Sequence, residues 1–288
     1  MDRVRLLSPR ELADALGVSE SSLKRWVDAG KITAARTEGG HRRIALQEAV
    51  RFIRETGAPL ARPELLDMPE ISAVRMADDA FRHYLVEGDA VAARGWLLAR
   101  YLGGASIAAL CDGPVREAMH RIGELWQHDD DGIFVEHRAT DTCVQALAQL
   151  RATFEPPAGA PFALGATPEA DPYLIPAFMA AMVVASVGMR SINLGPDTPI
   201  GALASAFARH HPVLVWISAS AALSRERSSA LEAWLVALPT TTIAVVGGRH
   251  GHEIGPGRLQ FAETMAELAD LATTILRHNA VDVHQLRR

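Results

Sequence analysis

Two clusters of hydroxyl and cationic side chains lie within the first 43 residues. Guanidinium and ammonium groups bind phosphate oxygens, and small polar side chains can approach base edges. At the N-terminal end of a helix, such groups can reach both in a major groove. The sequence therefore predicts contacts with double-stranded DNA from Ser21, Ser22, Lys24, Arg25, Arg36, His41, Arg42 and Arg43.

Two short helices with a sharp turn between them are expected to carry the first cluster. Ser8 can cap the first helix, and Glu11, three residues later, can complete a capping box. Gly17 can end that helix in a left-handed conformation, because glycine has no side chain to clash. Ser19 can cap the second helix, whose apolar residues would pack on the first and leave the polar ones facing outward.

The second cluster is expected on a hairpin. Residues 31–35 and 43–45 could pair as short strands around the turn at 37–40, which would bring the cations of this wing close to a phosphate backbone. The whole stretch resembles the winged helix-turn-helix of MerR-family transcription regulators, and its segment 39–43 (GGHRR) is similar to that family's signature. The resemblance implies a DNA-binding domain over residues 1–57.

The N-terminal segment is basic, whereas the rest of the chain has an excess of acidic residues. Residues 1–57 carry 11 Lys and Arg against 8 Asp and Glu, whereas the whole 288-residue chain has a net charge of −5. This asymmetry favours a regulator whose other domains stay off the DNA. No apolar run is long enough for a membrane span, and the two cysteines are too few for a disulfide framework, so we expect a cytoplasmic protein.

Two linkers divide the chain into three expected domains. Residues 57–69 and 155–159 are rich in proline and glycine. Between them, residues 70–154 show four helical segments with short connections, which favours an antiparallel four-helix bundle, and the Gly113-Pro114 pair should interrupt the third segment. The third domain is expected over residues 160–288.

Short apolar runs alternate with helical segments in this third domain. The alternation predicts a parallel sheet with helices on both faces, and ligands in such folds bind beyond the carboxyl ends of the strands. The expected fold class is therefore multidomain α and α/β, with a winged helix-turn-helix, a four-helix bundle and a doubly wound Rossmann-like domain. The expected strands are 162–166, 191–194, 213–218 and 242–246, and the expected helices are 172–187, 199–209, 224–237 and 265–279.

The loops after these strands resemble the cobalamin-binding domain of corrinoid proteins. The segment 194–199 (LGPDTP) follows the second strand, Ser218 and Ser220 form a Ser-x-Ser after the third, and Gly247-Gly248 follows the fourth. Hydroxyl groups and small residues at these places would admit a long ligand tail running down the strand ends. The resemblance implies that Ser218, Ser220, Gly247 and Gly248 bind the ligand.

The helical region adds to this resemblance. Trp126, nine residues, then Glu136 and His137 are similar to the Trp-x9-Glu-His signature of the CarH/LitR photoreceptor class. In that class the bundle caps adenosylcobalamin, and light breaks its cobalt–carbon bond. The resemblance implies that Trp126 and Glu136 surround the ligand, while His137 could either contact the ligand or form a hydrogen bond within the bundle.

Two histidines of the resembled families are missing from this chain. Where that family ligates cobalt with the His of a Glu/Asp-x-His-x-x-Gly motif, this chain has Asp171 and then Tyr173 in place of the His. A phenol is a poorer cobalt ligand than a neutral imidazole. Asp171 could bind the ligand or cap the helix that Pro172 would open. Gln127 stands where light-sensing members carry a second histidine.

Several ligands remain open on this pattern. The pocket could hold adenosylcobalamin or another cobalamin with non-histidine coordination, or a different flat tetrapyrrole such as biliverdin or haem, or nothing. Asp171 and Tyr173 are the candidate contacts at the first strand end. The chain shows no constellation of metal-ligating or catalytic residues beyond this pattern, so we expect no enzymatic activity.

Three functions fit these observations. The first is a transcription repressor that binds an operator as a homo-oligomer, a dimer or tetramer, and senses a tetrapyrrole or light. The second is a ligand-independent MerR-type regulator controlled by protein partners or by oligomerisation. The third is a corrinoid carrier component of a methyltransferase, which the missing histidine and the DNA-binding segment disfavour.

Overall fold

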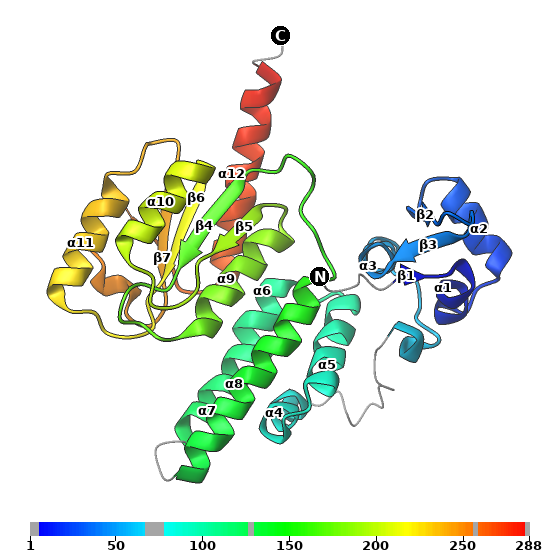
Figure 1. Ribbon diagram of the computed structural model, residues 1–288, viewed down its shortest axis with the longest axis horizontal. Coiled ribbons are helices and arrows are strands. Elements are labelled where there is room, and N and C mark those ends of the chain that lie inside the picture. The colour runs from blue at the N-terminus through cyan, green and yellow to red at the C-terminus, as the bar shows by residue number, and fades with distance from the viewer. Residues whose placement is uncertain (1–5, 67–77, 126–129, 256–258, 286–288) are drawn as a thin grey trace. The chain divides into compact units, whose positions relative to one another are not determined.

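A computed structural model describes residues 6–66, 78–125, 130–255 and 259–285 (Figure 1). The chain divides into two compact units. The first comprises residues 1–106 and 113–154, and the second comprises residues 107–112 and 155–288. Among the described helices, none is both long and apolar enough to cross a membrane.

The first unit begins with a winged helix-turn-helix. Strand β3 pairs antiparallel with both β1 and β2, and this small sheet carries three helices. The apolar faces of these helices meet in a core that includes Leu12, Leu23, Ile44 and Phe52. The elements are β1 (Leu6–Leu7), α1 (Pro9–Leu16), α2 (Glu20–Asp28), β2 (Ala35–Arg36), β3 (Arg42–Ala45) and α3 (Leu46–Thr56).

The segment after α3, expected as a linker, packs back on this domain. The backbone N–H groups of Ala61 and Arg62 donate to the carbonyl of Ala15 at 2.8 and 3.0 Å. A 3₁₀ turn, η1 (Pro63–Leu66), follows and buries Leu66. The described part of this segment is therefore ordered against α1, although its proline content alone indicated an extended connection.

Four helices of the first unit pack side by side through apolar faces. Helix α8 contacts the other three, and Phe81 of α4 stacks on Trp96 of α5 with ring centroids 5.3 Å apart. The predicted interruption at Gly113-Pro114 is confirmed: a π-helical turn, Cys111–Val115, separates α6 from α7. The helices are α4 (Asp78–Glu87), α5 (Ala90–Leu102), α7 (Arg116–Leu125) and α8 (Asp130–Arg151), with α6 (Ile107–Leu110) in the second unit.

The second unit is built on a five-stranded parallel sheet with helices on both faces (Figure 1), so the predicted fold class is confirmed. The strand order is β5-β4-β6-β7-β8, which places β6 in the middle. The strands are β4 (Phe162–Ala166), β5 (Arg190–Asn193), β6 (Leu214–Ser218), β7 (Ile243–Gly247) and β8 (Gln260–Ala262). The helices are α9 (Leu174–Ser186), α10 (Ile200–His210), α11 (Arg225–Val236) and α12 (Met265–Gln285).

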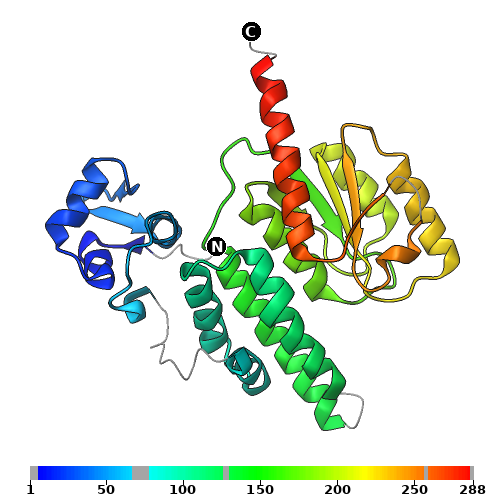
Figure 2. The same ribbon diagram turned by 180° about the vertical axis from the view of Figure 1, so that it is seen from behind.

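Alternate strand residues face opposite sides of this sheet. Val215 and Ile217 of β6 belong to a buried cluster with Leu203 of α10 and Leu231 of α11. The intervening residues therefore face the other side, where α9 contacts β4, β5 and β6, and where α12 contacts α9. Figure 2 shows α12, in red, beside the strands on this side.

A carboxylate from the π-helical turn begins α12. Asp112 accepts hydrogen bonds from the backbone N–H groups of Met265 and Ala266, at 2.8 and 3.0 Å. A negative side chain at a helix N-terminus satisfies free N–H groups and opposes the positive end of the helix dipole. Asp112 therefore ties α6 to the last helix of the second unit.

Candidate nucleic-acid interface and ligand-binding edge

The predicted caps of α1 and α2 are confirmed. Ser8 and Glu11 form a reciprocal capping box, and Gly17 ends α1 with a φ of 66°. The hydroxyl of Ser19 accepts from the backbone N–H of Ser22 at 3.1 Å. These local bonds fix the turn between the helices, so the first turn of α2 projects from the domain with a defined orientation.

The outward side of α2 carries the first predicted cluster. Ser21, Lys24 and Arg25 are exposed. The ammonium group of Lys24 lies 2.8 Å from the carboxylate of Glu20, and this contact holds the pKa of Glu20 below its usual value. The Ser22 hydroxyl lies 2.9 Å from that of Ser19 and accepts from Arg25 at 3.2 Å. Ser22 thus helps to orient Arg25.

The wing carries the second predicted cluster, and its cations have different surroundings. Arg36 and His41 are exposed at the hairpin. Arg42 instead donates to the carboxylate of Asp28 at 2.6 Å, with about a quarter of its side chain exposed (26%). Because Asp28 ends α2, this ion pair ties the wing to that helix. The turn between the strands is closed by the bond from the Gly40 N–H to the Thr37 carbonyl, 2.8 Å long.

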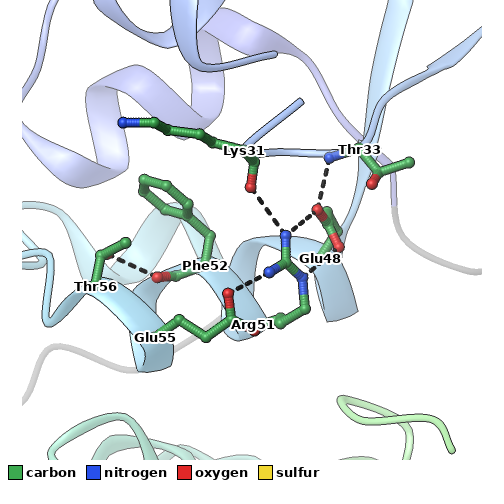
Figure 3. A network of polar contacts seen from close by, with 7 residues as sticks. All are labelled: Lys31, Thr33, Glu48, Arg51, Phe52, Glu55 and Thr56. Atoms are coloured by element: carbon green, nitrogen blue, oxygen red, sulfur yellow. Dashed lines mark hydrogen bonds and ion pairs between the residues drawn. The ribbon is translucent and has the colours of Figure 1, made fainter. Parts of the chain in front are cut away.

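Helix α3 supports the wing through a polar network (Figure 3). Glu48 accepts from the Thr33 N–H at 2.6 Å, and Arg51 bonds to Glu48 and to the Lys31 carbonyl at 2.9 Å. Arg51 also pairs with Glu55. Burial acts to raise the pKa of Glu48, but the bonds from Arg51 and Thr33 outweigh it, so the pKa lies below its usual value. The bonds that Arg51 donates to Glu48 and Glu55 raise the pKa of Arg51 above its usual value.

The predicted ligand contacts of the bundle fall on α8 and on the segment before it. Trp126, like Gln127, lies outside the described residues. Glu136 is half-buried and accepts from the Thr140 hydroxyl at 2.9 Å. The imidazole of His137 lies 3.6 Å from the other carboxylate oxygen of Glu136, and its side chain is largely exposed (76%).

Asp171 is fully buried and bonds within the protein. One carboxylate oxygen accepts from the backbone N–H groups of Ser220 and Ala221, at 2.5 and 2.8 Å. The other accepts from the Tyr173 N–H at 3.1 Å. The expected helix opening at Pro172 is wrong, because α9 begins at Leu174. Asp171 instead joins the loop after β4 to the loop after β6.

A second link joins the loops after β4 and β5. Ala170 and Asp197 both have positive φ values, 71° and 51°. The Ala170 N–H donates to the Asp197 carboxylate at 2.7 Å, and the Asp197 N–H donates to the Asp171 carbonyl at 3.0 Å. The buried hydroxyl of Thr167 donates to the Tyr173 carbonyl at 3.0 Å. This edge of the sheet is therefore held together by its own side chains.

Tyr173, Ser218 and Ser220 lie at the same edge with different exposure. The Tyr173 ring is about half exposed (52%), directly before α9. Ser218 ends β6 and is almost fully buried, whereas Ser220 is partly exposed. Of the predicted ligand contacts in the second unit, Asp171, Tyr173 and Ser220 are brought together, since Asp171 accepts from the backbone N–H groups of the other two.

The Gly-Gly pair fits closely against the backbone of its neighbours. A side chain on Gly248, which has a φ of 93°, would place its Cβ 2.4 Å from the Ala219 carbonyl oxygen. A Cβ on Gly247 would lie 2.8 Å from the carbonyl oxygen of Ala262. Both glycines are therefore required by close contacts within the sheet edge, independently of any ligand.

The acidic side chains at this edge bond to backbone N–H groups of the protein itself. Among the described residues there is no group of three His, Cys, Asp or Glu side chains that could hold a metal. The buried carboxylate of Asp171 already accepts three N–H bonds.

Comparisons with known proteins assign the two helical parts of the first unit. Residues 6–56 match the family described as a helix-turn-helix domain, and residues 77–151 match the family described as a B12 binding domain. No curated protein matches the chain.

Three solved structures are similar to this chain at low sequence identity. The monomethylamine corrinoid protein of Methanosarcina barkeri matches with a TM-score of 0.53 and 18% identity, over 68% of this chain and 96% of its own. A cobalamin-binding protein of Desulfitobacterium hafniense matches at 0.35 and 18%, over 69% of this chain and 98% of its own. The methanol:cobalamin methyltransferase complex of M. barkeri matches at 0.35 and 15%, over 90% and 93%.

The first of these similarities supports the fold of the helical and α/β parts. Together with the two family matches it describes a DNA-binding domain followed by a cobalamin-binding-type module. This arrangement fits a CarH-like regulator that joins a helix-turn-helix to a B12 binding domain.

Proposed function

We propose that this chain is a one-component transcription repressor whose C-terminal half senses a tetrapyrrole, or light through that tetrapyrrole. The observation that carries the proposal is the winged helix-turn-helix with exposed Ser21, Lys24 and Arg25 on α2 and exposed Arg36 and His41 on the wing. The helix enters a major groove, and the wing cations bind the flanking phosphates.

The two kinds of arginine on the wing have separate roles in this proposal. Arg36 and Arg43 contact phosphates. Arg42 holds the wing against α2 through Asp28, as their 2.6 Å bond indicates. Ser22 orients Arg25 toward the groove through the bond from its guanidinium.

A single small reading head makes few base contacts, so the operator would contain repeated half-sites bound by a dimer or tetramer. A ligand that binds one assembly state better than another then shifts DNA occupancy by its difference in affinity. Occupancy of a promoter by the assembled protein excludes polymerase, which gives repression. A methyl-carrying role is disfavoured, because Tyr173 stands where a carrier would need a cobalt ligand.

The candidate ligand contacts of the sensing half are polar side chains carried by two separate units. Tyr173, Ser218 and Ser220 line the sheet edge, while Glu136 and His137 lie on α8 of the other unit. The candidates are adenosylcobalamin with non-histidine coordination, biliverdin and haem. A bound tetrapyrrole supplies absorption of visible light.

DNA binding is tested by fluorescence anisotropy with the DNA upstream of the chain's own coding sequence. The full chain should bind this DNA in preference to a scrambled duplex of equal length. Arg25→Ala should reduce the preference by about 1–3 kcal/mol if its guanidinium reads a base. Arg36→Ala should weaken both duplexes alike and lower the salt slope by about one. Arg209→Ala removes the same charge from an exposed position on α10. This control should change neither the preference for the upstream DNA nor the salt slope.

The ligand is tested by absorption spectra of the full chain after incubation in the dark with adenosylcobalamin, biliverdin or haem and gel filtration. Retention of one of them, with DNA affinity that changes on loading or illumination, supports the sensing proposal. Specific DNA binding with no retained ligand would instead support a regulator controlled by protein partners. Equal affinity for the upstream DNA and for the scrambled duplex would contradict the proposal that this chain is a sequence-specific regulator.

A further inference from the structure

A tryptophan occupies the middle of the sheet. Trp216 lies in β6, the central strand, and only 2% of its surface is exposed. Its neighbours Val215 and Ile217 belong to the core beneath α10 and α11. Since strand residues alternate, the indole of Trp216 faces the opposite side, which α9 covers.

The indole lies across the neighbouring strand. Gly165 of β4 pairs in register with Trp216. A Cβ built on Gly165 would be 2.1 Å from the indole Cδ2 and 2.2 Å from Cε2. The ring therefore fills the volume that a side chain on the adjacent strand would take, and only glycine is compatible with it.

The indole of Trp216 fills space, and its buried Nε1 makes no hydrogen bond with the described residues. Buried indole N–H groups are usually bonded, so the position accepts that cost in return for filling space. Helix α9, which covers this side, is buried along most of its length, including Met179 and Met182. The layer between β4, β6 and α9 is thus closed by large apolar groups.

Ser218 lies at the carboxyl end of the same strand, β6. It is two residues beyond Trp216 on the same strand and therefore faces the same side. A ligand tail that entered the sheet past the Ser218 hydroxyl would meet the indole next. The same edge is closed from the side by Asp171, whose carboxylate binds the backbone of Ser220 and Ala221.

We infer that Trp216 blocks the sheet to the nucleotide tail of a cobalamin, so that this domain selects a tetrapyrrole by its ring and not by its tail. The inference rests on the proposed tetrapyrrole-sensing function and names the residue that decides which tetrapyrroles fit. Trp216 is then a residue that determines which tetrapyrroles bind, although its indole does not contact the tetrapyrrole ring. Trp216 should not weaken the binding of ligands that lack a nucleotide tail, such as cobinamide, biliverdin and haem.

The test compares two corrinoids that differ in the tail. Dicyanocobinamide lacks the nucleotide that cyanocobalamin carries, and each is titrated into the full chain while its absorption spectrum is followed. The wild-type chain should bind the two within about twofold of each other, or bind neither. Trp216→Ala opens the layer and should bind cyanocobalamin at least about tenfold more tightly than dicyanocobinamide, because the apolar benzimidazole base of the tail would then be buried.

Matched variants keep the result interpretable. Trp216→Phe retains most of the ring and should behave as the wild type, and Trp216→Leu provides an intermediate opening if the alanine variant does not fold. Circular dichroism and DNA binding report that each variant is folded. The inference is overturned if the wild type prefers cyanocobalamin by about tenfold or more, or if folded Trp216→Ala and Trp216→Leu gain no preference for it. If the wild-type chain does not prefer the operator DNA, the proposed function is contradicted. The ratio of its affinities for cyanocobalamin and dicyanocobinamide tests the present inference separately.

Discussion

The carboxylate of Asp171 should control the stability of the loop after β6. It is fully buried and accepts N–H bonds from Ser220, Ala221 and Tyr173. In Asp171→Asn the amide oxygen can keep two of these donors, while the NH₂ group meets the third. The charge that strengthens all three bonds is also lost.

The size of the effect follows from these bonds. One lost bond and two weakened bonds cost about 1 kcal/mol each at most. Because Ser220 and Ala221 are partly exposed, water can bond to their N–H groups and reduce this cost. We therefore expect about 2 kcal/mol less stability for the loop, which raises amide exchange about 30-fold where exchange follows local opening. Asp171→Ala removes every acceptor and should have the larger effect.

Hydrogen exchange of the full chain, followed by mass spectrometry of peptides covering residues 218–223, measures this effect. Asp270→Asn is the matched control, because Asp270 is exposed on α12 and loses the same charge. Unchanged exchange over residues 218–223 in Asp171→Asn would refute the reasoning. So would an equal increase in Asp270→Asn, since the effect would then come from net charge rather than from the three bonds.

Three further perturbations test other parts of the chain. Glu48 has a lowered pKa, so its stabilising contribution is present above its ordinary pKa of 4.5 and is lost as pH falls through the folded value; Glu48→Gln should flatten this acid dependence in thermal melts. Burial raises the pKa of Cys143 to about 12, so a thiol reagent at about pH 8 should label it only on unfolding, as a time course in denaturant would show. Arg54 bonds to the Ala105 carbonyl at 3.0 Å and lies over the Tyr101 ring. Burial raises the pKa of Tyr101 and Arg54 partly offsets this, so Arg54→Met should raise it further in a spectrophotometric titration.

Local signals explain what the sequence could predict. A cap such as Ser8 or Ser19 acts on N–H groups two or three residues away. Its effect can therefore be predicted from the residues next to it in the sequence. The strand Phe162–Ala166 begins and ends where predicted, because it is an apolar run between a proline and a polar loop. By contrast β8 (Gln260–Ala262) was missed: it is short, its residues are largely exposed, and only its pairing with β7 makes it a strand.

Contacts distant in sequence account for the rest of the candidate site. Asp171 could be placed at the correct loop, but its bonds to Ser220 and Ala221 cross about 50 residues and carry no local signal. Likewise the sequence shows Gly165 and Trp216 only as members of two strands. Their opposition follows from the parallel register, which was not specified by either strand alone. A Trp two residues before Ser218 was nevertheless a readable signal that this strand face is filled.

The residues that resemble a ligand-binding motif divide into two kinds once their contacts are known. Asp171 and Gly248 each have a task within the fold, since one binds backbone N–H groups and the other permits close approach of Ala219. Their presence would be required with or without a ligand, so it carries little information about which ligand binds. Tyr173, by contrast, exposes half of its ring at the position that faces the ligand in the resembled family. Variation at Tyr173 should therefore alter ligand choice while leaving the fold intact, whereas variation at Asp171 or Gly248 should alter the fold first.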